Sequence, residues 1–180
     1  EDFWGVGRVT TRRMHALGIR TGKDLRECSR DFLLRNFGKQ GGVYYDFARG
    51  VDLRPVQPAR IRKSVGCEHT LEQDVDTPAA LLIELYHVVL DLEGRIARSG
   101  FRGSTLTFKI KFADFSQHTR SVTRREVFET KGDILPLAKR LLAQAREELG
   151  ERPVRLLGLS VSNSLPDAPV CYVRQLKFDF

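Results

Sequence analysis

Two glycines bracket one apolar residue in the segment Trp4-Gly5-Val6-Gly7-Arg8-Val9-Thr10, directly before an expected helix. Glycine lets the backbone approach a ligand closely, and the N–H groups at a helix start point outward, so together they form a candidate anion site. Such a hairpin between two helices, a helix-hairpin-helix, binds a nucleic-acid phosphate without reading sequence. Arg12 and Arg13 add positive charge nearby, and 37–41 is a looser second copy. The alternative is an ordinary helix cap followed by a tight turn.

Basic residues concentrate in a second region, where strands are expected. Between positions 102 and 125 six basic side chains stand against one acid, for a charge of +5, whereas the helix expected at 78–98 has three acids and two bases, for −1. The threonines and serines between the basic residues are short hydroxyl donors suited to phosphate oxygens. This pattern favours a sheet that faces a polyanion; the alternative is a solvated sheet face, which is commonly rich in Thr and Lys. The basic residues are Arg102, Lys109, Lys111, Arg120, Arg124 and Arg125.

The third candidate site is the segment 175–180, in which Gln175 precedes apolar side chains at alternating positions, Leu176, Phe178 and Phe180. Apolar anchors beside a polar hook are typical of a docking peptide. The same period-2 pattern also fits an ordinary last β-strand with the three apolar side chains on its inner face. Both interpretations stand on the residues of this segment alone.

Side chains capable of acid–base or nucleophilic chemistry do not form a recognisable constellation. Two short acidic pairs are interpreted as surface or helix-face charges, and one histidine and one tyrosine have no reactive partner visible in the sequence. The cysteines and histidines lack the ligand spacing of a structural zinc site. We therefore expect neither catalysis nor a metal site in this chain. The acidic pairs and the two single residues are Asp74, Asp76, Glu147, Glu148, His118 and Tyr44.

Composition limits the class of protein. The 180 residues include 30 basic and 23 acidic side chains, a net charge of +7 that favours a polyanionic partner. The sequence has no signal-peptide pattern and no apolar run near the ~20 residues that span a bilayer, so no membrane partner is expected. Three separated cysteines, Cys28, Cys67 and Cys171, fit reduced thiols of a cytoplasmic protein. The first residue is Glu1 rather than Met, which suggests a fragment.

The elements that position these residues are expected in two domains. The segment 53–62 carries two prolines and no helical period, so it is predicted to be an extended, basic linker. Residues 1–52 are predicted to form four short helices, which must pack on one another because none is stable alone. The first helix is expected to be capped by Thr10 or Thr11, and the fourth to begin after Gly41-Gly42. Thr21 and Ser29 are expected to cap the second and third helices.

The second predicted domain covers 63–165 and has the order β-α-β-β-α-β. Its strands are expected at 64–71, 105–112, 117–128 and 154–162, and its two amphipathic helices begin near Pro78 and Gly132. The fold class is therefore α+β: a small all-α helix-hairpin-helix domain, then a two-layer domain with a four-stranded sheet and two helices on one face. Residues 166–180 are expected to form a tail that carries the candidate docking peptide.

Taken together, these pieces resemble the C-terminal half of Y-family translesion DNA polymerases of the bacterial DNA polymerase IV (DinB) type. The resemblance covers nearly all of the chain in order, and the Arg62-Lys63-Ser64-Val65-Gly66 element is fairly diagnostic. The matching stretches also include Phe3-Trp4-Gly5-Val6-Gly7, Gly18-Ile19-Arg20-Thr21, Phe37-Gly38-Lys39, Ala48-Arg49-Gly50-Val51-Asp52, Thr107-Phe108-Lys109-Ile110-Lys111-Phe112, Thr119-Arg120-Ser121 and Val154-Arg155-Leu156-Leu157-Gly158-Leu159.

The resemblance implies a thumb at 1–52 and a little-finger, or polymerase-associated, domain at 63–165. Both hold template–primer DNA by its phosphates, and the tail peptide docks on the bacterial sliding clamp through Gln175, Leu176, Phe178 and Phe180. Mg²⁺ and its carboxylates are expected in a palm domain absent from this chain, which alone is predicted to be inactive. The expected DNA-binding residues are Gly5, Val6, Gly7, Arg8, Thr10, Lys63, Ser64, Val65, Gly66, Arg102, Lys109, Thr119, Arg120 and Ser121.

Two other functions remain open at this point. Some relatives in this family have lost their catalytic carboxylates, so the chain could belong to a non-catalytic adaptor that binds clamp and DNA during mutagenic repair. It could also be a repair protein in which a helix-hairpin-helix domain is joined to an unrelated α+β domain. The residues upstream of Glu1 would decide between polymerase and adaptor.

Overall fold

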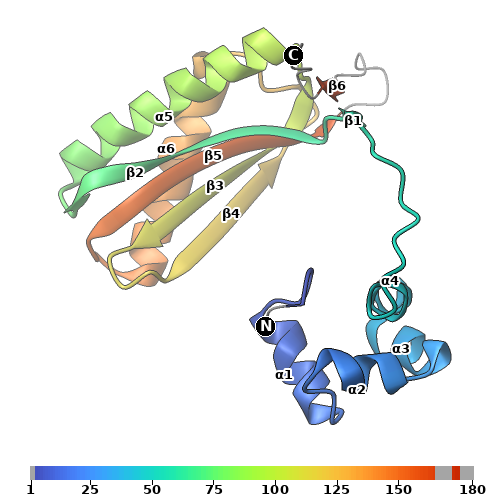
Figure 1. Cartoon of the computed structure of the whole chain (residues 1–180). Helices are drawn as coiled ribbons and strands as arrows, with labels where there is room; N and C mark the ends of the chain where they lie inside the picture. Colours follow the sequence, from blue (N-terminus) through green and yellow to red (C-terminus); the bar gives the residue numbers. More distant parts are fainter. Residues whose placement is uncertain (1–2, 165–171, 175–180) are drawn as a thin grey trace, which may run out of the picture. The chain divides into compact units, whose positions relative to one another are not determined.

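The computed structural model describes residues 3–164 and the backbone of residues 172–174 (Figure 1). The chain divides into two compact units, Glu1–Val56 and Gln57–Phe180. Each unit has a hydrophobic core of its own, built from side chains of that unit. The two units are therefore described separately.

The described part of the first unit holds four short helices, α1 (Arg8–Ala16), α2 (Gly22–Glu27), α3 (Arg30–Phe37) and α4 (Lys39–Phe47). Their apolar sides share one core, which gives these short helices the stability they lack individually. The buried members of this core are Val6, Met14, Ile19, Leu25, Leu33 and Tyr44.

The predicted caps of α2 and α3 are confirmed. The Thr21 hydroxyl accepts a hydrogen bond from the Asp24 N–H at 3.1 Å, and the Asp24 carboxylate accepts one from the Thr21 N–H at 2.9 Å. This reciprocal pair is a capping box. Hydrogen bonds from the backbone N–H groups of Arg20 and Thr21 to the Asp24 carboxylate are the main causes that lower the pKa of Asp24. The Ser29 hydroxyl accepts from the Phe32 N–H at 3.2 Å.

Two other expectations for this unit are wrong. The cap of α1 is Gly7, not Thr10 or Thr11; the Thr11 hydroxyl lies inside the helix and donates to the Gly7 carbonyl at 3.2 Å. Helix α4 begins at Lys39, so Gly41 lies inside it rather than before it. Glycine is needed at position 41 because α4 packs closely on α3 at this point: a Cβ on Gly41 would lie only 2.0 Å from the Leu33 carbonyl oxygen of α3.

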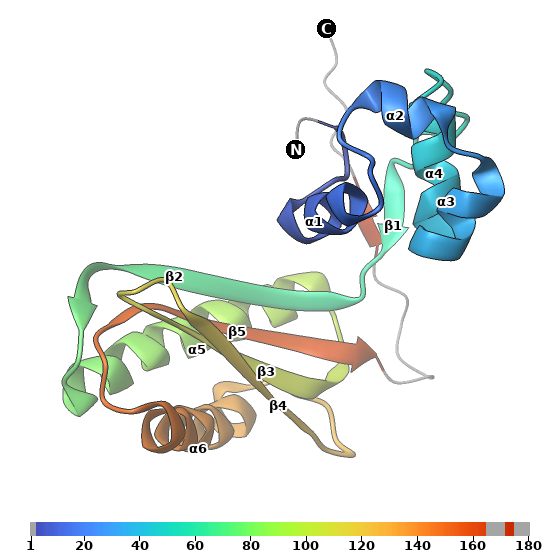
Figure 2. The ribbon, with the colours of Figure 1, turned by 90° about the horizontal axis from the view of Figure 1, so that it is seen from below.

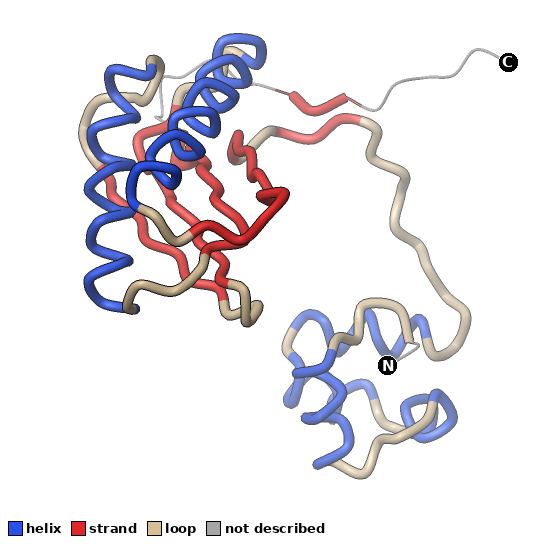
Figure 3. The backbone as a smooth tube through the Cα atoms, turned by 90° about the vertical axis from the view of Figure 1, so that its left-hand side faces the viewer, coloured by secondary structure: helices blue, strands red, loops and turns tan. Residues whose placement is uncertain are grey.

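The second unit contains a four-stranded sheet and two helices in the predicted β-α-β-β-α-β order. The strands stand in the order β2-β5-β3-β4 with every neighbouring pair antiparallel, so β2 and β4 form opposite edges (Figure 2). Both helices cover one face of the sheet, which makes two layers (Figure 3). The elements are β2 (Ser64–Val75), α5 (Pro78–Ser99), β3 (Gly103–Phe112), β4 (Gln117–Thr123), α6 (Lys131–Leu149) and β5 (Val154–Ser164).

Strict alternation along β3 positions the core of this unit. Leu106, Phe108, Ile110 and Phe112 are buried against the helices, as their spacing predicted. The strand expected to run to position 128 instead ends at Thr123. The chain turns inward there, because Phe128 is fully buried in the core and its N–H donates to the Gly103 carbonyl at 2.9 Å.

A further pair of short strands was not predicted. Residues Ala59–Ile61 form β1, which pairs antiparallel with β6 (Tyr172–Arg174), so that Ala59 stands opposite Arg174. The end of the segment expected to be a linker therefore belongs to the second unit as a paired strand. Each of these strands is three residues long, too short for any periodicity to reveal.

Candidate nucleic-acid interface

The face of the sheet that points away from α5 and α6, called here the open face, is built from side chains in register across all four strands. Its first row consists of hydroxyl residues only, and its second row has one glycine and three hydroxyl residues. Short hydroxyl side chains suit contact with phosphate oxygens. The first row is Ser64, Ser162, Thr105 and Thr123; the second is Gly66, Ser160, Thr107 and Ser121; the third is Glu68, Gly158, Lys109 and Thr119; the fourth is Thr70, Leu156, Lys111 and Gln117.

Cross-strand hydrogen bonds hold the hydroxyl rows together. The Thr105 and Thr123 hydroxyls are 2.8 Å apart, as are those of Thr107 and Ser121. Each hydroxyl keeps further donor or acceptor capacity for a ligand. At Gly66 a Cβ would lie 2.7 Å from the Ser160 Cβ, so only glycine keeps the second row flat.

The open face gathers five of the predicted binding residues, Ser64, Gly66, Lys109, Thr119 and Ser121. Lys63 is exposed and stands directly before β2, next to the first row. These residues come from segments up to about sixty positions apart in the chain, and the register of the sheet brings them together.

Two predicted residues within the strands do not place their side chains on this face. Val65 is only 3% exposed and belongs to the helix-covered core. Arg120 stands opposite Phe108, so its side chain also points to the helix side, where it forms an ion pair with Glu148 of α6. Strand alternation explains both cases, because neighbours in a strand point to opposite faces.

The basic character expected of the sheet is weaker than the charge count suggested. Arg102 pairs with Glu129 at 3.1 Å, and Arg124 pairs with Asp133 at 3.2 Å. On the open face itself, Lys109 pairs with Glu68. The open face is therefore better described as a hydroxyl surface with partly neutralised cations than as a basic surface.

The glycine hairpin is anchored by the residue between its two glycines. Val6 is 8% exposed and packs in the core of the first unit, while Gly5 takes a positive φ of +81°. The Tyr44 hydroxyl donates to the Gly5 carbonyl at 3.2 Å, which ties the hairpin to α4. Gly7 follows as the N-cap of α1. The two glycines allow the sharp bend of the backbone, and the buried Val6 side chain holds the hairpin against the core of the first unit.

The start of α1 keeps features of an anion site. Its first turn contains no acidic residue, and within the described residues no side chain caps it. Arg8 is exposed and Thr10 is partly exposed in that turn. Free N–H groups, the positive end of the helix dipole and an adjacent guanidinium together favour a bound phosphate.

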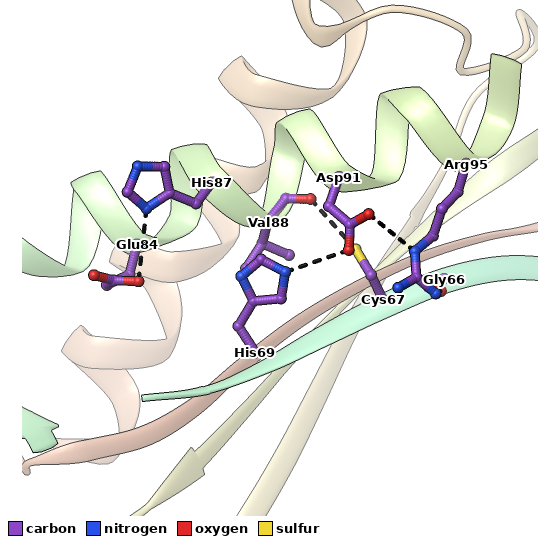
Figure 4. A network of polar contacts seen from close by, with 8 residues as sticks. All are labelled: Gly66, Cys67, His69, Glu84, His87, Val88, Asp91 and Arg95. Atoms are coloured by element: carbon purple, nitrogen blue, oxygen red, sulfur yellow. Dashed lines mark hydrogen bonds and ion pairs between the residues drawn. The ribbon is translucent and has the colours of Figure 1, made fainter. Parts of the chain in front are cut away.

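A polar network at the edge strand β2 was not predicted from the sequence (Figure 4). Asp91 of α5 accepts from Arg95 Nε at 3.1 Å and lies 3.3 Å from His69 Nε2, and Arg95 in turn donates to the Gly66 carbonyl at 3.1 Å. The hydrogen bond from Arg95 is the main cause that lowers the pKa of Asp91. The spacing of Asp91 and Arg95, four positions apart on one helix, was the available signal.

Cys67 lies beside this network and is shielded from water. Its thiol donates to the Val88 carbonyl at 3.3 Å. Burial, with a smaller contribution from the Asp91 carboxylate, raises the pKa of the Cys67 thiol to about 12. Cys67 is thus a structural side chain rather than a reactive thiol.

Across 3–164, the structure brings together no set of three His, Cys, Asp or Glu side chains able to hold a metal ion. Among the helices described, none is long and apolar enough to cross a membrane. The residues of the predicted docking peptide, Gln175, Leu176, Phe178 and Phe180, lie outside the described residues.

Comparisons with known proteins match both units. The family profile "impB/mucB/samB family C-terminal domain" matches residues 62–177, and the profile "DNA polymerase-iota, thumb domain" matches residues 1–52.

The chain is 58% identical over 168 residues to a DNA polymerase IV of Bacteroides fragilis, covering 93% of this chain and 46% of the relative. It is 53% identical over 163 residues to a DNA polymerase IV of Akkermansia muciniphila, covering 91% and 45%. The chain thus spans about half the length of these curated relatives.

Solved structures share the fold. A chimeric Y-family DNA polymerase, Dbh-Dpo4(243-245)-Dbh, aligns with a TM-score of 0.70 at 21% identity, covering 91% of this chain and 46% of the other. DinB from Sulfolobus solfataricus aligns with a TM-score of 0.51 at 19% identity, covering 90% and 46%. With profiles matched along both units, the chain belongs to the impB/mucB/samB family of Y-family DNA polymerases and carries its thumb and C-terminal domains.

Proposed function

We propose that this chain is the DNA-holding part of a DNA-directed DNA polymerase that copies past lesions during damage tolerance in the bacterial cytoplasm. The observation that carries the proposal is the open face, on which rows of hydroxyl and small residues extend across four strands and β3 adds Lys109 and Lys111. Such a surface of short hydroxyl side chains suits the phosphates of either strand, and phosphate contacts carry no sequence information. The hairpin at Gly5 and Gly7 adds a second, independent phosphate site.

Polymerisation itself is assigned to a part of the intact protein outside this chain. Nucleotidyl transfer needs carboxylates that hold two Mg²⁺ ions, and that role belongs to a palm domain. In this division of work, the first unit holds the duplex through α1 and the hairpin, while the second unit holds it through the open face. Because neither contact depends on base identity, the same surfaces accept damaged templates.

DNA binding is tested by fluorescence anisotropy of the 180-residue chain with a labelled primer–template between 50 and 200 mM salt, a range over which phosphate contacts weaken steeply. We expect affinity to fall with salt and to be the same for unrelated sequences. Lys63→Gln should lower the slope of log K against log[salt] by about 0.9, the contribution of one phosphate contact. Lys139→Gln, an exposed charge on α6 behind the sheet, is the matched control. Salt-independent binding, or equal effects of both variants, would contradict the proposal.

We also propose that the segment 175–180 docks on the sliding clamp. The proposal rests on its sequence, in which Gln175 supplies a polar hook and Leu176, Phe178 and Phe180 supply apolar anchors for a groove. Gln175→Ala with Leu176→Ala should abolish binding to a bacterial clamp and leave DNA binding unchanged. Lys177→Ala, at a spacer position, is the control and should bind normally. Undiminished clamp binding by the double variant would identify the segment as an ordinary strand.

A further inference from the structure

One ion pair lies in the middle of the open face. Lys109 of β3 and Glu68 of β2 stand on either side of β5, and their side chains meet with Nζ and Oε2 2.5 Å apart. Within the four rows defined above, Glu68 is the one acidic side chain, and it lies between the hydroxyl rows and the row of Lys111. A carboxylate at this position would repel the phosphates that the face is proposed to hold.

The residue between the two charges makes this pairing possible. Gly158 of β5 stands in register with both Glu68 and Lys109. A Cβ there would lie 3.0 Å from the Glu68 Cβ and 3.5 Å from the Lys109 Cβ. Without that side chain, the long stems of Glu68 and Lys109 can cross the backbone of β5 and meet above it.

The pair contributes little to folding. The side chains of Lys109 and Glu68 are 29% and 50% exposed. Ion pairs exposed to this degree typically add little to the stability of a protein. Other contacts hold β2, β5 and β3 together, since the ladder hydrogen bonds continue on both sides of this row. The placement of an acid here therefore affects the surface more than the fold.

We infer that Glu68 is a positioning residue that withholds Lys109 from phosphate and keeps the centre of the open face close to neutral. This inference rests on the DNA-binding function proposed above. With Glu68 in place, Lys109 lies down over Gly158 toward β2, and a phosphate must compete with a carboxylate already in contact. The face then holds the duplex by hydroxyls and flanking charges, loosely enough for DNA to move across it.

The test compares Glu68→Gln, Lys109→Gln and the double variant with the parent chain, using anisotropy with the same primer–template and salt range. Glu68→Gln should raise affinity roughly two- to five-fold, the equivalent of one exposed ion pair. It should also steepen the salt slope by about 0.9, because Lys109 becomes a phosphate contact. Lys109→Gln should lower affinity, because it leaves the Glu68 carboxylate unpaired on the face that meets phosphates. In the double variant the gain from Glu68→Gln should disappear.

Glu147→Gln is the matched control, because it removes one exposed acid from α6 on the other side of the sheet. An equal gain from Glu147→Gln, or a gain from Glu68→Gln that persists in the double variant, would show general charge repulsion and overturn the inference. So would a Glu68→Gln chain that binds like its parent. If the parent itself shows no salt-sensitive binding, the proposed function fails and this inference fails with it. Circular dichroism of each variant checks that the fold is retained.

Discussion

Single residues decide which surface of this protein is available for binding. Arg120 was expected on the open face because it lies among basic residues, yet its neighbours Thr119 and Ser121 take that face and Arg120 turns to α6. The same strand alternation that predicted the core of β3 predicts this outcome when applied to β4. The charge count over 102–125 ignored that alternation, and it also ignored acids outside that range, such as Glu68 and Glu129.

The buried thiol of Cys67 gives a prediction at the same scale. Because its pKa is raised to about 12, it should hold at least ~100-fold less thiolate at pH 8 than an ordinary thiol. Iodoacetamide should therefore leave Cys67 unmodified in the folded chain at pH 8 and modify it after unfolding in urea. Peptide mass spectrometry resolves the site. Rapid modification of Cys67 in the folded chain would contradict the burial of this thiol.

The same shift makes stability depend on alkaline pH. Below the ordinary thiol pKa of 9.0 both folded and unfolded chains keep the proton, so Cys67 adds no pH dependence. As pH rises from 9 toward 12, the unfolded chain loses its proton first, and the free energy of unfolding falls. Urea unfolding at pH 8 and 10.5 should show this loss for the parent and less of it for Cys67→Ala.

At the scale of elements, the sequence predicted correctly those features of helices and strands that depend on residues close together in the chain. The capping residues Thr21 and Ser29 and the alternation of β3 were correct, because each depends on neighbours within a few positions. The start of α4 was wrong, since glycines usually end helices and their burial at a helix contact is visible only in three dimensions. The pairing of β1 with β6 joins segments more than one hundred positions apart and has no local signal.

The contact of α3 with α4 leads to a prediction for Gly41. Gly41→Ala places a Cβ 2.0 Å from the Leu33 carbonyl oxygen, so the two helices must separate. Overpacking of this kind typically lowers the free energy of unfolding by about 1–3 kcal/mol. Gly22→Ala is the matched control: Gly22 opens α2, and nothing lies within 4 Å of an added Cβ. It should change stability by no more than about 1 kcal/mol, in the favourable direction. Urea unfolding followed by circular dichroism compares the two variants, and equal effects would contradict the close contact.

At the scale of the whole molecule, both ends of the predicted linker are held by their own unit. Arg54 lies over the rings of Trp4 and Phe47, at 4.9 and 4.7 Å, and pairs with Asp52 at 2.8 Å. At the other end, β1 pairs with β6. The unanchored part of the linker is therefore shorter than the sequence suggested and runs over 55–58, where both of its prolines stand.

Separate cores and a short connection predict that the two units unfold independently. Gly41→Ala should lower the melting temperature of the first unit by roughly 4–8 °C for each kcal/mol lost. The single tryptophan, Trp4, packs on Phe47 with ring centroids 5.5 Å apart, so its fluorescence reports the first unit. Hydrogen exchange of α5 reports the second unit, and its protection should not change in Gly41→Ala. If exchange in α5 rises together with the loss of the Trp4 signal, the two units share one cooperative transition. Protection retained in α5 would mean that the second unit stays folded while the first unit unfolds.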